Sequence, residues 1–78
     1  MKAKEKRMLR VLGMRIKQLR NERTMTQQAL ADEADITRYI ISDIERGVAN
    51  PTTTTLYAIA EALQVPLSEL MDFKVPEK

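Results

Sequence analysis

Residues 26–47, TQQALADEADITRYIISDIERG, constrain the fold of this chain more than any other stretch. The second half carries isoleucines at helical spacings: Ile36, Ile40, Ile41 and Ile44. One face of this helix is therefore apolar and the opposite face is polar. The first half, residues 27–34, is shorter than the roughly 12 residues that an isolated helix needs in water. The stretch is predicted to be two short helices joined by a tight turn, packed against the rest of the chain.

Residues that begin and end helices bracket both halves of this stretch. Thr26 and Thr37 each precede a helical run, where a hydroxyl accepts hydrogen bonds from the free amides of the first turn. Gly47 follows the second run, and glycine readily adopts the left-handed conformation that ends helices. Both helices are thus predicted to have defined starts, and the second to have a defined end.

The residues before this stretch predict a first helix over about residues 7–23. Its apolar stripe falls at spacings of three and four: Leu9, Leu12, Ile16 and Leu19. Gly13 interrupts this helix, and we interpret it as a site of close helix packing, because an interior glycine costs roughly 1 kcal/mol relative to alanine. Residues 1–8 are predicted to be either a basic extension of the helix or a flexible arm.

Two further helices are predicted after the glycine that ends the central stretch. The loop VANPTTTT is rich in turn-forming residues, and Thr52 or Thr53 can begin the next helix. Its core positions recur at helical spacing: Leu56, Ile59, Ala60 and Leu63. Pro66 opens a last short helix, and residues 74–78 are predicted to be a disordered tail. The chain is therefore predicted to be all-α, a compact five-helix bundle whose domain spans residues 9–73.

Composition excludes several classes of function. The chain has 78 residues with no Cys and no His, so it lacks the commonest nucleophile, the commonest general base and most transition-metal ligands. We therefore expect no enzyme activity, no cofactor, no metal and no small-molecule ligand. No apolar run approaches the roughly 18 residues of a membrane span, so we expect a cytoplasmic protein without a membrane partner. A core this small is expected to gain stability by dimerisation.

Charge is divided unevenly along the chain. Residues 1–25 contain nine basic and two acidic side chains, a net charge of +7, whereas residues 26–78 contain four basic and nine acidic ones, a net charge of −5. A basic amino-terminal third suggests an anionic partner, such as nucleic acid or a membrane surface. The membrane interpretation is disfavoured because the apolar stripe of the first helix is needed by the core.

Four segments, occurring in order, resemble the lambda-repressor-like, Cro/C1-type helix-turn-helix family, also called the XRE family. They are LGMRIKQLR, MTQQALADEADI, TRYIISDIERG and NPTTTTLYAIAEALQVPLSELM, and they cover about residues 9–71. Single-domain members include controller proteins of restriction-modification systems, small phage and mobile-element repressors, and some antitoxins. The resemblance implies that residues 37–46 form a recognition helix in the major groove of double-stranded DNA, while the preceding helix lies across the backbone.

The resemblance also implies roles for single residues. Base edges would be read by four residues of the recognition helix: Arg38, Tyr39, Ser42 and Asp43. Phosphates would be contacted from the first two helices and from the loop after the recognition helix: Arg20, Gln27, Arg46, Asn50 and Thr52. Arg20 is further implied to form a structural salt bridge with Glu45.

The chemistry of the reading positions agrees with this assignment in part. Arg38 can donate two hydrogen bonds to guanine O6 and N7, the commonest specific contact in the major groove. Tyr39 can donate to a phosphate or lie against a thymine methyl, or can simply be solvated. Asp43 departs from the Lys, Arg, Gln or Asn of the family, and can either accept from cytosine N4 or exclude wrong sequences. Thr24 stands where a glycine commonly closes the first helix, so its turn is expected to be strained.

Two functions follow from these observations. The first is a sequence-specific transcriptional regulator that binds double-stranded DNA as a homodimer on a palindromic operator. The alternative is an antitoxin or protein-interaction module whose main partner is another protein, which the acidic balance after residue 25 and Asp43 favour slightly. The apolar carboxyl-terminal end is interpreted as a lid over the core, a self-association patch, or both. The residues of this candidate dimer interface are Leu67, Leu70, Met71 and Phe73.

Overall fold

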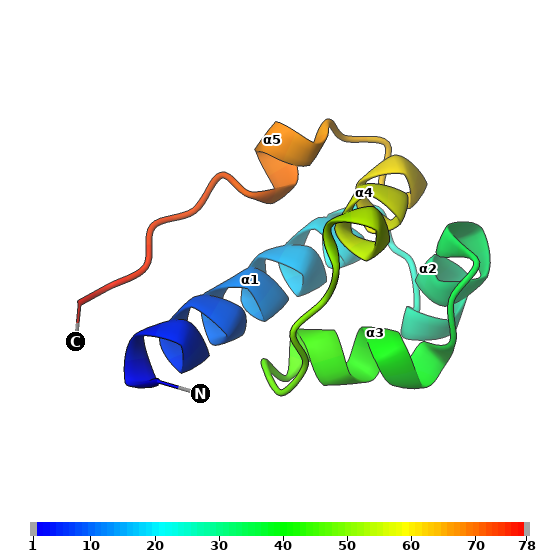
Figure 1. The fold of residues 1–78 in the computed structure, drawn as a ribbon. Coiled ribbons are helices and arrows are strands. Elements are labelled where there is room, and N and C mark those ends of the chain that lie inside the picture. Colours follow the sequence, from blue (N-terminus) through cyan, green and yellow to red (C-terminus); the bar gives the residue numbers. More distant parts are fainter. Residues whose placement is uncertain (1, 78) are drawn as a thin grey trace.

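The computed structural model describes residues 2–77 and contains five helices within them (Figure 1). They are α1 (Ala3–Glu22), α2 (Gln27–Ala34), α3 (Arg38–Glu45), α4 (Thr53–Ala62) and α5 (Leu67–Leu70). The same described residues contain no strand, so the predicted all-α fold is confirmed. None of the helices found between residues 2 and 77 is long and apolar enough to cross a membrane.

One hydrophobic core lies between the helices. The long α1 packs against α3 and α5, while α2 packs against α3 and α4, and α4 packs against α5 (Figure 1). Each helix contributes at least one fully buried side chain: Ile16, Leu30, Ile41, Ile44, Ile59 and Leu70. The predicted stripe of α1 is also confirmed, because all four of its leucine and isoleucine side chains are at most 4% exposed. The core therefore fixes one face of every helix, including α3.

Threonine hydroxyls begin the three central helices, as the sequence predicts. The Oγ1 atoms of these residues accept from the backbone amide three positions later: Thr26 from Ala29 at 3.0 Å, Thr37 from Ile40 at 3.3 Å, and Thr52 from Thr55 at 3.1 Å. Each bond satisfies an amide that has no partner inside its own helix. The choice between Thr52 and Thr53 for the start of α4 is resolved in favour of Thr52.

Left-handed residues end the first four helices. Their φ angles are 52° at Thr24, 57° at Asp35, 75° at Gly47 and 60° at Gln64. The amide that follows each of them donates to a carbonyl five residues earlier, as in the 3.0 Å bond from the Val48 amide to the Asp43 carbonyl. This is the Schellman arrangement, which satisfies carbonyls at the end of a helix. Only one of these four ends carries the glycine that favours it.

Two glycines bring α1 into backbone contact with the end of α3. A Cβ atom on Gly13 would lie 2.3 Å from the Ile44 carbonyl oxygen, and a Cβ atom on Gly47 would lie 2.8 Å from the Arg10 Cα atom. Neither position has room for a side chain. The interpretation of Gly13 as a site of close helix packing is confirmed. This close contact fixes where α1 crosses α3.

The first helix begins earlier than the sequence predicts. Residues 3–6, which the sequence left open between a helix extension and an arm, are helical, and the backbone amide of Lys2 donates to the Glu5 carboxylate at 3.4 Å. The extra turn extends α1 beyond the end of α3 (Figure 1), and it adds Lys4 and Lys6 to the helix. Met1, the first residue of the predicted arm, lies outside the described residues.

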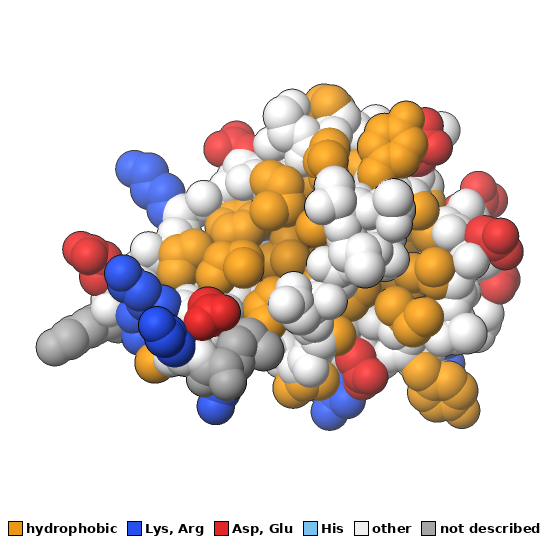
Figure 2. Space-filling model, viewed as in Figure 1, with side chains coloured by type: hydrophobic (Ala, Val, Ile, Leu, Met, Phe, Trp, Pro, Cys, Tyr) orange, Lys and Arg blue, Asp and Glu red, His pale blue; other side chains and the backbone are white. Residues whose placement is uncertain are grey.

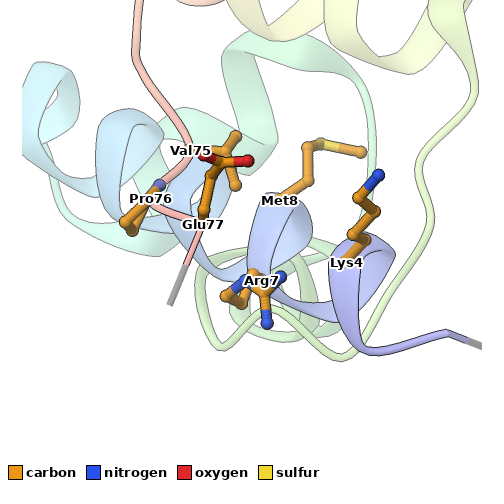
Figure 3. A pocket seen from close by; sticks show the side chains of 6 residues that line it. All are labelled: Lys4, Arg7, Met8, Val75, Pro76 and Glu77. Carbon is orange, nitrogen blue, oxygen red and sulfur yellow. The ribbon is translucent and has the colours of Figure 1, made fainter.

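The segment after α5 returns toward the start of α1 (Figure 1). Figure 3 shows the side chains from both segments around one hollow: Lys4, Arg7 and Met8 from α1, with Val75, Pro76 and Glu77 from the returning segment. The prediction of a disordered tail over residues 74–78 stays a prediction, and Lys78 lies outside the described residues.

Thr24→Gly is expected to stabilise the protein. A β-branched residue with a φ of 52° is strained by roughly 1–2 kcal/mol, and glycine removes this strain at the cost of a more flexible unfolded chain. We expect the free energy of unfolding to rise by about 1 kcal/mol in urea titrations followed by circular dichroism. The same change at Thr54, which is exposed inside α4, is expected to lower it; a Thr24 variant no more stable than the wild type would refute the strain.

Candidate nucleic-acid interface

The helix α3 presents a polar face to solvent because its other face belongs to the core. Ile41 and Ile44 are 0% and 1% exposed. On the opposite side Tyr39 is 72% exposed, Arg38 is exposed, and Asp43 is half-buried. The structure therefore brings together on one surface the four residues that the sequence assigns to base reading, with half-buried Ser42 completing the set. We call Arg38, Tyr39, Ser42 and Asp43 the reading face.

The apolar side of α3 is narrower than the sequence predicts. Ile40, which the periodicity places on the apolar face, is 41% exposed. It lies at the margin of the buried side, because Ile41 and Ile44 already occupy the core positions of this short helix. The predicted apolar face of α3 is therefore present, but it does not bury Ile40.

The charged residues of the reading face are already partnered within α3 and the residue after it. The Asp43 carboxylate accepts a hydrogen bond from Arg46 Nη2 at 2.6 Å, and the Arg38 guanidinium carbon lies 5.1 Å from the centre of the Tyr39 ring. An exposed ion pair of this kind contributes less than about 1 kcal/mol to stability. Its main effect is local: Arg46 offsets the negative charge of Asp43 beside the surface that would meet phosphates.

A buried polar network joins α1, α2 and α3 at the carboxyl end of α3. Arg20 Nε donates to Glu45 Oε2 at 2.7 Å and Arg20 Nη2 donates to Glu45 Oε1 at 3.1 Å. Arg20 Nη1 donates to the Met25 carbonyl at 2.7 Å, and Gln27 Nε2 donates to Glu45 Oε1 at 3.0 Å. Arg20 and Glu45 are only 8% and 9% exposed, so the pair lies in a region of low dielectric constant where both charges need partners.

This network uses all three guanidinium nitrogens of Arg20 and one N–H of Gln27. The side chain of Arg20 is 10% exposed. That burial argues against a phosphate contact, which stays a prediction. Gln27 is half-buried at the first position of α2 and keeps its amide oxygen and one N–H unused by Glu45, so its predicted phosphate contact also remains open to test.

The remaining predicted phosphate residues follow α3 in the loop that leads to α4. Arg46 and Asn50 are exposed, and Thr52 is exposed with its hydroxyl engaged in capping α4. They lie in the segment that connects the carboxyl end of α3 to the start of α4. Their phosphate contacts stay predictions.

Two arginines of the basic amino-terminal third donate hydrogen bonds to backbone carbonyls elsewhere in the protein. Arg15 donates to the Glu69 carbonyl from Nε at 3.2 Å and from Nη2 at 2.9 Å, which satisfies a carbonyl of α5. Arg23 Nε donates to the Leu63 carbonyl at the end of α4. Sequence reasoning missed both roles, and no local pattern signals them, because each bond joins residues at least 40 positions apart. The net charge of the first 25 residues therefore overstates what remains for a partner.

The candidate dimer interface is only partly available. Leu70 is 0% exposed and belongs to the core, because α5 folds its side chain inward; its assignment to an interface is wrong. Leu67 and Phe73 are half-buried against the core, and Met71 is 39% exposed. Hydrophobic side chains gather on the face that α1, α4 and α5 border (Figure 2). The exposed apolar surface is therefore not confined to α5.

Comparisons with known proteins identify the class to which this fold and reading face belong. A helix-turn-helix family model matches residues 16–70. Control protein C.BamHI of Bacillus amyloliquefaciens is 39% identical over 64 residues, which are 81% of this chain and 79% of that protein. The immunity repressor protein of Bacillus phage phi105 is 43% identical over 60 residues, 77% of this chain, although the match spans only 42% of the repressor.

A solved structure shows the same architecture. The crystal structure of the restriction-modification controller protein C.AhdI from Aeromonas hydrophila superimposes with a TM-score of 0.79 at 29% identity, covering 80% of this chain and 94% of that one. The molecule is therefore a helix-turn-helix protein with a lambda-repressor-like fold. The chain belongs to the Cro/C1-type helix-turn-helix (XRE) family and carries a DNA-binding domain of the type found in transcriptional regulators and repressors.

Removing one partner of the buried pair is expected to destabilise the protein far more than removing both. Arg20→Met or Glu45→Met leaves one charge buried without a partner, so each should lower the free energy of unfolding by about 3 kcal/mol or more. The double variant should lose much less than the sum of the two losses, because no unpaired charge remains. Urea unfolding of the four proteins measures this coupling.

The exposed pair on α3 supplies the control for this cycle. Asp43→Asn breaks the ion pair with Arg46, which is exposed, and should change the free energy of unfolding by less than about 1 kcal/mol. If the two single Met variants were as mildly affected as Asp43→Asn, the buried network would not be what holds α3 against α1.

Proposed function

We propose that this chain is a sequence-specific DNA-binding transcriptional regulator that acts as a homodimer on a palindromic operator. The observation that carries the proposal is the reading face of α3, whose side chains are exposed or half-buried while the opposite side of the helix is buried through Ile41, Ile44 and Glu45. The major groove of B-DNA admits one α-helix and presents a distinct pattern of donors and acceptors for each base pair. A rigid helix with an exposed polar face suits that groove.

Arg38 is the residue we propose to carry most of the sequence preference. It is exposed at the first position of α3, and its guanidinium can donate to guanine O6 and N7 together. The Tyr39 ring beside it can lie against a thymine methyl or donate through its hydroxyl. Asp43 accepts only, so among base edges it suits the N4 amine of cytosine, and its pairing with Arg46 lessens repulsion from neighbouring phosphates.

Two copies related by a twofold axis would present two reading faces to one side of the duplex. Dimeric helix-turn-helix proteins place their recognition helices about 34–36 Å apart, one turn of B-DNA, so the operator would be an inverted repeat. The apolar face bordered by α1, α4 and α5 supports self-association there (Figure 2), as does the 39% exposure of Met71 at the end of α5. A domain of this size also gains from burying such a surface.

Selection of preferred duplexes from random DNA tests this function. We expect enrichment of one inverted repeat whose half-sites are about one helical turn apart. Binding to that duplex should weaken steeply between about 50 and 200 mM salt, because each phosphate contact releases counterions. Selection without any enriched sequence would contradict the proposal. Salt-independent capture of another protein by the same surface would favour the protein-interaction module instead.

Arg38→Ala is expected to weaken binding to the selected duplex by about 1–3 kcal/mol and to relax the preference at one position of each half-site. Gln27→Ala is the comparison, because a phosphate contact should weaken binding to all sequences alike. Competition binding with a set of single-base variants of the selected duplex measures both effects. Full retention of preference by Arg38→Ala would show that α3 does not read DNA through this residue.

Met71→Asp is expected to shift the protein toward a monomer in sedimentation velocity without DNA. The substitution places a charge on the partly exposed apolar end of α5, and burying that charge against a second copy would be costly. Val48→Asp is the matched control, because Val48 is 62% exposed in the loop after α3 and lies outside the proposed interface. Equal association of the two variants would place the dimer contact elsewhere.

A further inference from the structure

A groove lined by three cations lies between α1 and the loop that follows α3. Its lining consists of Lys6 and Arg10 from α1 with Arg46, Gly47 and Val48 from the loop. Lys6 and Arg10 are four residues apart on a helix, so their side chains share one face. The extra helical turn at the start of α1 is what brings Lys6 to this groove.

The walls of the groove are fixed by backbone contact. Gly47 lies so close to α1 that a Cβ atom on it would be 2.7 Å from Arg10 Cγ and 2.8 Å from Arg10 Cα. The amide of Val48 donates to the Asp43 carbonyl at 3.0 Å, which ties the loop to the last turn of α3. The cations from the two segments are therefore held near one another before any ligand binds.

The α1 cations of the groove form no ion pair within the described residues, whereas the arginines farther along the chain bond to protein oxygens. Arg15, Arg20 and Arg23 all donate to carbonyl or carboxylate oxygens of the protein. Within residues 2–77 the ion pairs are Arg20 with Glu45 and Arg46 with Asp43, and neither includes Lys6 or Arg10. Asp43 offsets one charge of the three, so the groove keeps an excess of about two positive charges, which attracts an anion.

The position of the groove indicates which anion it suits. Arg46 follows the last residue of α3 and bonds to Asp43, so the groove adjoins the reading face at its carboxyl end. Figure 2 shows that most Lys and Arg side chains on this side of the molecule lie at the end where α1 begins. Guanidinium groups bind phosphate oxygens in pairs, and the lysine adds a point charge.

The geometry points to a phosphate-binding groove made by Lys6, Arg10 and Arg46, which grips the DNA backbone beside the major groove that α3 enters. This inference rests on the proposed function. It assigns to the first turns of α1 a direct contact with a phosphodiester, in addition to the contacts implied for Gln27 and the loop after α3. The groove supplies affinity without sequence preference, because phosphates are the same at every base pair.

Salt titrations of Lys6→Gln, Arg10→Gln and the double variant test the groove. Affinities would be measured for the selected duplex and for a scrambled duplex. Because a homodimer places two copies of the groove on one duplex, each substitution should reduce the slope of log K against log salt by about 2, and the double variant should reduce it by about 4. Both duplexes should lose affinity by the same factor, so the ratio between them stays unchanged. Lys6→Arg should restore the wild-type slope.

Lys4→Gln is the matched control. Lys4 is an exposed lysine near the start of the same helix, but it lines the hollow next to the returning segment shown in Figure 3. Its loss changes the net charge equally but removes no proposed phosphate contact, so it should lower the salt slope of the dimer by clearly less than 2. If Lys6→Gln and Arg10→Gln changed the slope no more than Lys4→Gln does, the groove would not contact phosphate. Thermal unfolding should show that all variants remain folded.

The outcomes separate this inference from the function on which it rests. A wild-type protein that prefers the selected duplex, combined with groove variants that behave like the control, overturns the groove alone. A wild-type protein that binds selected and scrambled duplexes equally, with slopes that fall in the groove variants, overturns sequence-specific regulation and retains the groove. A wild-type protein that binds neither duplex overturns both.

Discussion

The buried ion pair between Arg20 and Glu45 is the interaction on which the arrangement of the helices depends. It joins the end of α1 to the last residue of α3, and Arg20 and Glu45 also hold the Met25 carbonyl and the Gln27 amide. Desolvation offsets much of the attraction in such a pair, so its net contribution to stability is small. An unpaired charge at either position would be costly, however. The pair therefore fixes how α3 is oriented more than it stabilises the fold.

Backbone contact at Gly13 and Gly47 completes this constraint. With no room for a side chain at either residue, α1 crosses the end of α3 at one place and one distance. The reading face and the cationic groove are thereby held next to each other on a rigid base. In the proposed function these two surfaces have different tasks. The reading face of α3 discriminates between DNA sequences through Arg38, whereas the cations around it supply affinity for the DNA backbone. Arg15, Arg20 and Arg23 are less suited to the second task, because each already donates hydrogen bonds within the protein.

Much of the fold could be predicted from the sequence, because apolar periodicity and threonine caps are local signals. The five helices and the caps at Thr26, Thr37 and Thr52 follow from them. The left-handed end at Gln64 could not be predicted, because glutamine does not mark that conformation and tertiary packing imposes it. The reading face was predicted as a set, but the burial of Leu70 and the groove at Lys6 depend on how distant segments pack.

The central claim is that the exposed side of α3 is the surface that meets DNA. Chemical-shift mapping of the ¹⁵N-labelled protein with the selected duplex tests it most directly, because every backbone amide reports its own surroundings. We predict that the largest shifts fall on residues 38–43 and on the loop after α3, while Tyr57 and Glu61 on the exposed side of α4 change little. Largest shifts on α4 and α5, with those of residues 38–43 unchanged, would contradict the account.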